Sequence, residues 1–130
     1  MKQAGWIVAL GVLLVTSIAG LRNATNELAS AVTPLQLSVG YGQLLYGFLG
    51  GLGAVGLARR RPWCVTIIAA WGVAAAYVAS VASFVFHDPT FSEEGTAAGV
   101  IAAGVSVLAI SSLVVWAARV ATRTPAPPAA

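Results

Sequence analysis

Residues 41–63 read YGQLLYGFLGGLGAVGLARRRPW, an apolar stretch rich in glycine that ends on three consecutive arginines before Pro62 and Trp63. Glycine inside a helix is less favourable than alanine by roughly 1 kcal/mol. The seven glycines between positions 40 and 56 therefore need a structural reason. A long uncharged apolar run is typical of a helix inside a lipid bilayer, and arginines are typical of its cytoplasmic edge. The stretch predicts a membrane-spanning helix whose glycines serve packing.

The rest of the sequence has the composition of a membrane protein. Of the 130 residues, 58% are hydrophobic and 8% are charged, with a mean hydropathy of +0.87. Soluble domains carry roughly 25% charged residues. Four apolar runs approach the roughly 20 residues that a helix needs to cross the hydrocarbon layer. They predict helices at about 5–21, 35–58, 63–86 and 95–118.

The fold class follows from the lack of water inside a membrane. Each backbone N–H and C=O must be paired within its own helix or in a closed barrel, and the runs lack the period-2 alternation of barrel strands. We expect an all-α polytopic membrane protein, an antiparallel bundle of four transmembrane helices forming one domain over residues 1–124. The Pro/Ala-rich residues 125–130 are expected to form a flexible tail.

The first apolar run has a second interpretation. Lys2, the apolar core and the small residues Ser17 and Ala19 also fit a signal peptide cleaved after Ala19. We expect the run to be retained as a helix. Because the sequence from residue 21 contains no Pro or Gly until Pro34, this helix is also able to continue beyond the lipid.

The charged residues indicate how the chain is oriented. Positively charged loops stay on the cytoplasmic side of a membrane. With four helices, most basic residues fall on one side, namely Lys2, Arg59, Arg60, Arg61, Arg119 and Arg123, and all four acidic residues fall on the other. We expect a protein of the bacterial inner membrane with both termini in the cytoplasm. The lipid bilayer is one partner, and nucleic acid is excluded because no basic stripe with interleaved aromatics exists.

Capping signals support the predicted helix starts. Thr33 is expected to cap the second helix, with Pro34 in its first position and Gln36 as the capping-box partner. Pro62 is expected to open the third helix in a similar way. Ser92 is expected to cap the fourth, whose first turn then holds two glutamates at the positive end of the helix dipole.

Small residues are expected to bring the helices together. In lipid there is no hydrophobic drive between helices, so association depends on the close backbone approach that small side chains permit. The predicted packing positions are Gly40, Gly47, Gly50, Gly51, Ala54, Gly72, Ala76, Ser80, Gly99 and Ala102. Such faces fit either a compact monomeric bundle or a surface for a partner helix or flat cofactor. Gly42, Gly53 and Gly56 lie off the main face of the second helix, which indicates a second contact surface.

Three polar residues are candidates for ligand binding, namely Gln43, Tyr46 and Tyr77. Gln43 lies roughly 12 Å below the outer start of the second helix, at 1.5 Å per residue. We expect its amide either to bond Ser80 or a backbone carbonyl of a neighbouring helix, or to contact a quinone, lipid or pigment. The tyrosines either assist such a site or lie in the core with one satisfied hydroxyl.

The outer loops hold the weakest candidates, for binding a metal. An imidazole with several carboxylates is able to bind a divalent cation, but the spacing here matches no established motif, so no metal site is predicted. His87 is also a candidate axial ligand for a haem-type or chlorophyll-type ring. The residues concerned are His87, Asp88, Glu93 and Glu94. The identity of any cofactor is unknown from the sequence.

Several activities are disfavoured. None of the four predicted spans contains an Asp, Glu, His, Lys or Arg, and proton-coupled transport normally needs one. Small multidrug-resistance transporters are similar in length and helix number, but that family relies on a glutamate in its first helix, where residues 6–20 hold no acid. The single cysteine, Cys64, excludes a C-x-x-C redox motif and is expected to be an apolar filler.

Two functional hypotheses follow. The sequence shows no nucleophile–base constellation, so we do not expect an enzyme. The first hypothesis is a non-catalytic accessory or structural subunit that packs through Gly/Ala/Ser helix faces in a membrane complex or homo-oligomer. The alternative is a binder or carrier of an apolar ligand, such as a lipid, quinone or pigment, held between the second and third helices.

Overall fold

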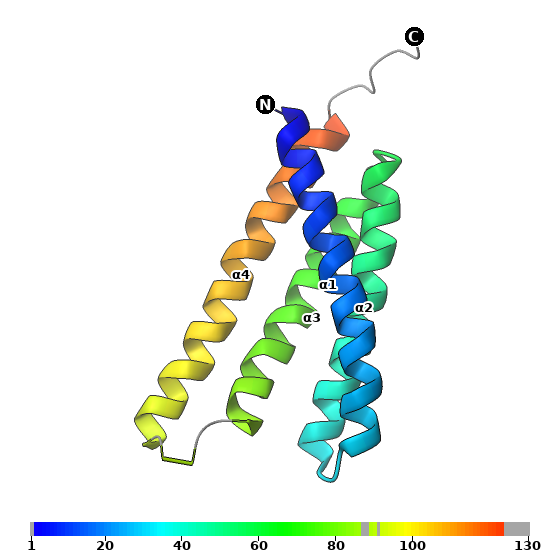
Figure 1. The fold of residues 1–130 in the computed structure, drawn as a ribbon. Coiled ribbons are helices and arrows are strands. Elements are labelled where there is room, and N and C mark those ends of the chain that lie inside the picture. The colour runs from blue at the N-terminus through cyan, green and yellow to red at the C-terminus, as the bar shows by residue number, and fades with distance from the viewer. Residues whose placement is uncertain (1, 87–88, 91, 124–130) are drawn as a thin grey trace.

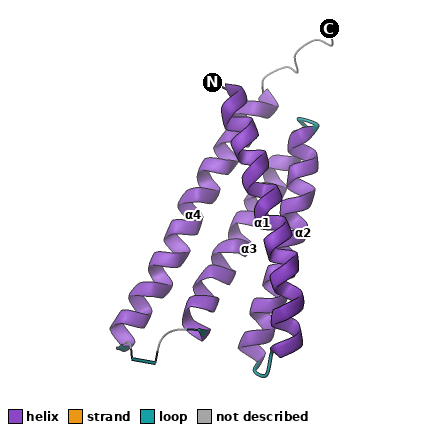
Figure 2. Ribbon diagram, viewed as in Figure 1, coloured by secondary structure: helices purple, strands orange, loops and turns teal. Residues whose placement is uncertain are grey.

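The computed structural model is all-helical and describes residues 2–86, 89–90 and 92–123. Its four helices are α1 (Lys2–Ser30), α2 (Pro34–Ala58), α3 (Cys64–Val85) and α4 (Glu93–Arg123). Neighbouring helices run antiparallel, so the start of α1, the α2–α3 turn and the end of α4 lie at one end of the molecule (Figure 1). We call this end the arginine end. Short turns join α1 to α2 and α2 to α3, as the colouring by secondary structure shows (Figure 2). The all-α prediction is confirmed.

Three of the helices are long and apolar enough to cross a membrane, within Ala4–Ser30, Cys64–Val85 and Glu93–Arg123. This is the architecture of a small membrane protein. α2 is not among them, since its many glycines lower its hydropathy. The fourth span therefore stays a prediction.

α1 and α4 extend beyond their predicted ends. α1 continues to Ser30, because Ala24 is fully buried in the second half of the helix and Leu28 packs on Gly40 of α2. α4 continues to Arg123, and Ala118 and Ala121 in its last turns belong to the hydrophobic core. Tertiary contacts thus hold both helices past the points where their apolar runs end.

The caps account for where the helices begin. At α2 the Thr33 hydroxyl accepts from the Gln36 N–H at 3.2 Å, and the Gln36 side chain accepts from the Thr33 N–H at 3.3 Å, which confirms the capping box. At α4 the Ser92 hydroxyl accepts from the Gly95 N–H at 3.0 Å, as predicted. The expectation for Pro62 is wrong in detail: α3 begins at Cys64, with Trp63 at the N-cap position and no side-chain cap bond there.

Glycines on α2 receive large side chains from α1. A Cβ added at Gly40 would lie 2.7 Å from the Leu28 side chain, and one at Gly47 would lie 3.1 Å from the Leu21 backbone nitrogen. The Ser17 hydroxyl donates to the carbonyl of Gly47, so a hydrogen bond also joins the two helices. The missing side chains therefore allow α1 and α2 to approach closely, the arrangement that lipid-embedded helices need.

A second set of α2 glycines receives side chains from α3. The pairs have a constant antiparallel offset, with each glycine facing one residue: Gly42 with Val78, Gly50 with Trp71, Gly53 with Ile68 and Gly56 with Cys64. The α3 members lie 4, 3 and 7 residues apart, which is a heptad-like spacing. The second contact surface expected for Gly42, Gly53 and Gly56 is thus α3 of the same chain.

α3 and α4 pack through two reciprocal glycine–serine contacts. A Cβ at Gly72 of α3 would lie 2.6 Å from Ser111 Cβ of α4, and one at Gly104 of α4 would lie 2.5 Å from Ser80 Oγ of α3. The Ser80 hydroxyl also donates to the carbonyl of Val100 at 3.4 Å. Each helix supplies one glycine and one serine to the contact.

The hydrophobic core is concentrated at the arginine end. It contains buried residues from all four helices, including Leu13, Leu57, Ile68 and Val114. α4 packs mainly along α3 and has far fewer contacts with α1 and α2. In Figure 1, α1 and α4 approach each other at the arginine end and diverge toward the opposite end. The bundle is therefore closed at one end and leaves much of α4 uncovered.

Candidate functional site

Gln43 is buried in α2, with 9% of its surface exposed. Its Oε1 atom accepts no hydrogen bond from the part of the chain that the structure describes. The predicted partner Ser80 instead faces α4. A buried acceptor without a partner loses roughly 1–3 kcal/mol of solvation, so Gln43 favours a bound water or a ligand donor nearby.

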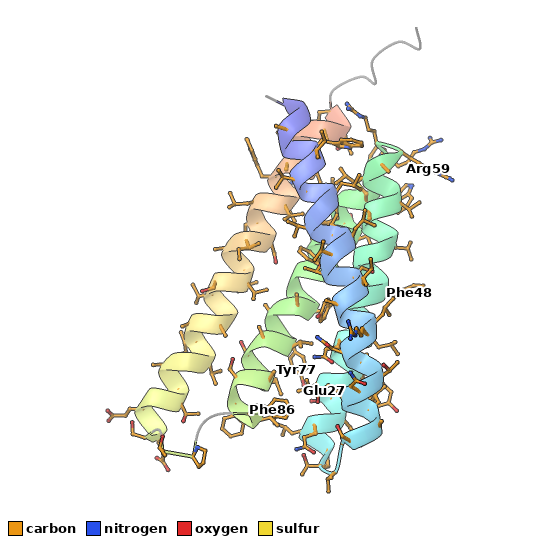
Figure 3. All side chains as sticks on the ribbon, in the orientation of Figure 1. Glu27, Phe48, Arg59, Tyr77 and Phe86 are labelled. Carbon is orange, nitrogen blue, oxygen red and sulfur yellow. The ribbon has the colours of Figure 1, made fainter. Side chains whose placement is uncertain are left out.

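Tyr46 and Tyr77 lie in different environments. Tyr46 is half-buried, and its ring packs over the backbone of Gly20 in α1. Tyr77 is 50% exposed, and its hydroxyl donates to the Ser38 hydroxyl at 3.2 Å. Figure 3 shows Tyr77 extending from α3 at some distance from the Phe48 side chain. Of these three residues, Tyr46 alone lines the central cavity described next.

A central cavity of about 300 Å³ lies where all four helices converge. Its lining is mostly apolar and comes from Val12, Thr16, Tyr46, Trp71, Ala75, Val78, Ala79, Val107, Ile110 and Ser111. Trp71 is 3% exposed, and its Nε1 atom donates no hydrogen bond to any described residue. The cavity volume falls at the low end of the roughly 300–1,000 Å³ typical of ligand pockets.

Trp71 is not among the residues that the small-residue pattern singles out. On a helical wheel it lies away from Gly72, Ala76 and Ser80 of α3. In the structure α3 lies between α2 and α4, so both of its faces are packed and Trp71 is buried. The heptad-like spacing of Cys64, Ile68, Trp71 and Val78 is the signal that indicates this second packed face.

The predicted packing residues fall into two groups. Those on α2 and α3 lie at helix contacts or close to them, and Gly40, Gly47, Gly50, Ala54, Gly72 and Ala76 are buried. Gly99 and Ala102 are exposed on α4, and a Cβ added at Gly99 would meet no described atom within 4 Å. The packed face of α4 carries Gly104, Ser111 and Ala118 instead.

The metal candidates do not form a group in the described residues. No cluster of three or more His, Cys, Asp or Glu side chains occurs within residues 2–86, 89–90 and 92–123. His87 and Asp88 lie outside the described residues. Glu93 and Glu94 are exposed in the first turn of α4. Cys64 is fully buried against Gly56, in the environment of an apolar filler.

An aromatic–basic cluster closes the arginine end. The Trp6 indole N–H donates to the carbonyl of Leu57 at 2.9 Å, and the Arg60 guanidinium lies 5.3 Å from the centre of the Trp6 ring, within cation–π range. Arg60 has a φ of 53°, and the Arg60 and Arg61 N–H groups donate to Leu57 and Gly56 as in a Schellman motif. The cluster ties the start of α1 to the α2–α3 turn.

Comparison with known proteins adds no assignment. No family model, curated protein or solved structure matches this chain. Any function must therefore be argued from the geometry of the chain itself.

Proposed function

We propose that the chain is a non-catalytic accessory or structural subunit of a membrane assembly, and that the outer face of α4 is its docking surface. This face is defined by Gly99, Ala102, Ser106 and Ala109, all of them exposed. The observation that carries the proposal is the contrast with α2, whose glycines all receive side chains from α1 or α3. On α4, by contrast, a row of small residues is exposed along one side of the helix, and a Cβ added at Gly99 would meet no described atom within 4 Å.

The face has the chemistry of a helix–helix contact. Its four residues recur at spacings of three and four, so they lie along one side of α4, opposite the side that packs on α3. A second helix is able to approach such a surface closely, as each of the contacts inside this bundle already demonstrates. The occupant is a helix of a partner protein or of a second copy of this chain.

We propose further that α2 is the fourth span. Its 25 residues extend for roughly 37 Å at 1.5 Å per residue. It lies antiparallel between α1 and α3 and contacts both along its length, so it must occupy the same depth as those two helices. Its outward side chains Leu44, Phe48 and Val55 are exposed and apolar, as lipid-facing residues are.

The proposed orientation places the arginine end in the cytoplasm of a bacterial cell, in the inner membrane. Arg59, Arg60 and Arg61 lie in the α2–α3 turn, and Arg123 ends α4 at the same end of the molecule. Glu93 and Glu94 begin α4 at the other end. The positive-inside rule favours this orientation.

The docking face is tested by two leucine substitutions, Ala102→Leu and Ala109→Leu. Both residues are exposed, so the substitutions should leave the bundle folded but keep a partner helix away. Ala19→Leu, at an exposed position of α1, is the matched control. We expect proteins that co-purify with the wild type in mild detergent, or cross-linked dimers, to be lost from the α4 variants alone. Retention of every partner by both α4 variants would refute the proposal.

A second candidate function, the carriage of an apolar ligand, is favoured by the central cavity, whose mostly apolar lining includes Trp71. Ala75 and Ala79 both line this cavity, so Ala79→Leu should fill part of it. Organic extraction of the purified protein, followed by mass spectrometry, tests the role. Equal recovery of a bound quinone, pigment or lipid from the wild type and from Ala79→Leu would argue against it.

A further inference from the structure

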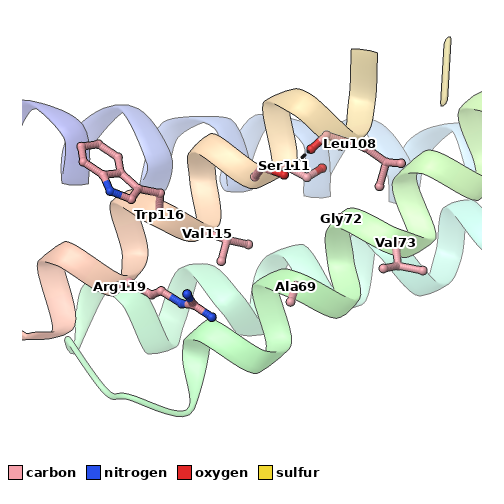
Figure 4. Close-up of a pocket in the computed structure, with 9 residues that line it drawn as sticks. Ala69, Gly72, Val73, Leu108, Ser111, Val115, Trp116 and Arg119 are labelled. Carbon is pink, nitrogen blue, oxygen red and sulfur yellow. Dashed lines mark hydrogen bonds between the residues drawn. The ribbon is translucent and has the colours of Figure 1, made fainter. Parts of the chain in front are cut away.

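A second cavity, of about 360 Å³, lies between α3 and α4 near the arginine end. Its apolar lining includes Ala69, Val73, Leu108 and Val115, and at one end it reaches Trp116 and Arg119. Figure 4 shows the Arg119 side chain extending from α4 toward α3, close to Ala69. We call this cavity the Arg119 groove. It adjoins the central cavity at Ser111, which lines both, and it shares no residue with the docking face on the outer part of α4.

The charge of Arg119 is not balanced within the groove. Among the acidic residues that the structure describes, Glu27 lies in the second half of α1, and Glu93 and Glu94 lie in the first turn of α4, all toward the opposite end. The fourth acidic residue, Asp88, lies outside the described residues. No ion pair of Arg119 occurs within residues 2–86, 89–90 and 92–123. A guanidinium at the edge of an apolar groove therefore has no counter-ion in the described chain, and it favours an anion there.

The groove has the length and polarity to hold a hydrocarbon chain that carries a charged headgroup. From Arg119 to Leu108 the lining follows α4 for roughly 16 Å at 1.5 Å per residue. Trp116, one turn from Arg119, is 64% exposed, and an exposed tryptophan near a helix end is typical of the headgroup level of a membrane. The polar end of the groove thus lies at the membrane interface and its apolar part lies deeper.

We propose that the Arg119 groove binds one anionic phospholipid, with the phosphate on the Arg119 guanidinium and an acyl chain along Ala69, Val73 and Leu108. In a phospholipid a hydrocarbon chain follows the phosphate. In the groove an apolar wall follows the cation, in the same order. Guanidinium groups bind phosphate oxygens through two parallel hydrogen bonds, which fixes the headgroup more firmly than diffuse attraction does. The proposal does not depend on the docking role of α4.

The test titrates the purified full chain in detergent with dioleoylphosphatidylglycerol or dioleoylphosphatidylcholine and counts bound lipids by native mass spectrometry. Because a charge-assisted contact contributes more than general attraction to a basic surface, we expect Arg119→Gln to weaken phosphatidylglycerol binding about tenfold. The matched control Arg123→Gln, one turn further along α4, should weaken it about threefold or less. Phosphatidylcholine binding should change little in either variant.

Two further variants separate the parts of the site. Ala69→Phe fills the apolar wall at an exposed position while it leaves every charge in place, and it should reduce the binding of phosphatidylglycerol. Arg119→Lys keeps the charge and should recover part of what Arg119→Gln loses. Circular dichroism on each variant confirms that the helices are intact. Equal losses in Arg119→Gln and Arg123→Gln, or full binding by Ala69→Phe, would overturn the proposal.

Discussion

α2 and α4 use small residues in different ways. On α2 each glycine from Gly40 to Gly56 faces a side chain of α1 or α3, so these glycines are covered by helices of the same chain. On α4 one face packs on α3 through Gly104 and Ser111, whereas the opposite face, which carries Gly99 and Ala102, is exposed. The same residue types therefore lie in a packed helix contact on α2 and on an exposed face on α4. Periodicity alone does not separate the two cases.

The largest effect is expected from Gly47→Leu on α2. A Cβ at this position already lies 3.1 Å from the Leu21 backbone nitrogen, and a backbone atom is unable to move aside. We expect a loss of about 3 kcal/mol or more in the free energy of unfolding, at the upper end of overpacking effects. Equilibrium unfolding of the protein in mixed micelles with rising sodium dodecyl sulfate measures it. Gly99→Leu is the matched variant and should cause no loss, because a Cβ there meets no described atom within 4 Å.

A smaller effect is expected from Gly72→Ala, at the α3–α4 contact. The new methyl would lie 2.6 Å from Ser111 Cβ, and a cost of about 1–3 kcal/mol follows from the overpacking. The double variant with Ser111→Gly moves the glycine to the other helix and should recover most of the loss. Additive losses in the double-mutant cycle would show that the two residues are not packed against each other.

Trp6→Phe sharpens the comparison at the arginine end, where a hydrogen bond rather than a glycine joins the helices. The change keeps an aromatic ring near Arg60 but removes the donor to the Leu57 carbonyl. We expect a loss of about 1 kcal/mol, the usual net value of one hydrogen bond. The same micelle unfolding measures it. Trp116→Phe, at a 64% exposed position of α4, is the control, and an equal loss there would contradict a specific role for Trp6.

The smallest effect, and the only gain, is expected from Gly99→Ala. Nothing among the described residues lies within 4 Å of the added methyl, so only the helix preference of alanine acts. The free energy of unfolding should rise by about 0.5–1 kcal/mol. In an assembled complex the sign should reverse, because the methyl then meets the partner helix. Comparison of the purified chain with the assembly, by thermal unfolding, measures both.

The sequence predicted the fold through signals that lie close together along the chain. Composition and the length of the apolar runs indicated helices, and Thr33 with Gln36 located the start of α2 because the capping box is a local arrangement of four residues. The apolar run predicted that α1 ends near residue 21, and the lack of Pro or Gly before Pro34 left a longer helix open. The structure has the longer helix, in which Ala24 is buried and Leu28 packs on Gly40 of α2.

The candidate site was less accessible to sequence reasoning. In a membrane, a leucine or tryptophan side chain is equally suitable facing the acyl chains or facing the protein core. The residue type alone therefore does not predict which of the two it faces. For this reason the sequence pattern did not single out Trp71 as a buried residue. Gln43 was correctly expected to be buried. Its predicted partner Ser80 faces α4 instead, because the direction of Ser80 depends on how the helices are ordered around the bundle.

The Leu57 carbonyl, which accepts both the Trp6 indole and the Arg60 amide, has a consequence for biogenesis. Trp6 leaves the ribosome 51 residues ahead of its acceptor, so its indole N–H lacks this partner until the end of α2 has been synthesised. The hydrogen bond between Trp6 and the Leu57 carbonyl therefore forms late. Nascent chains that end before the α2–α3 turn are expected to hold α1 in the membrane without this bond.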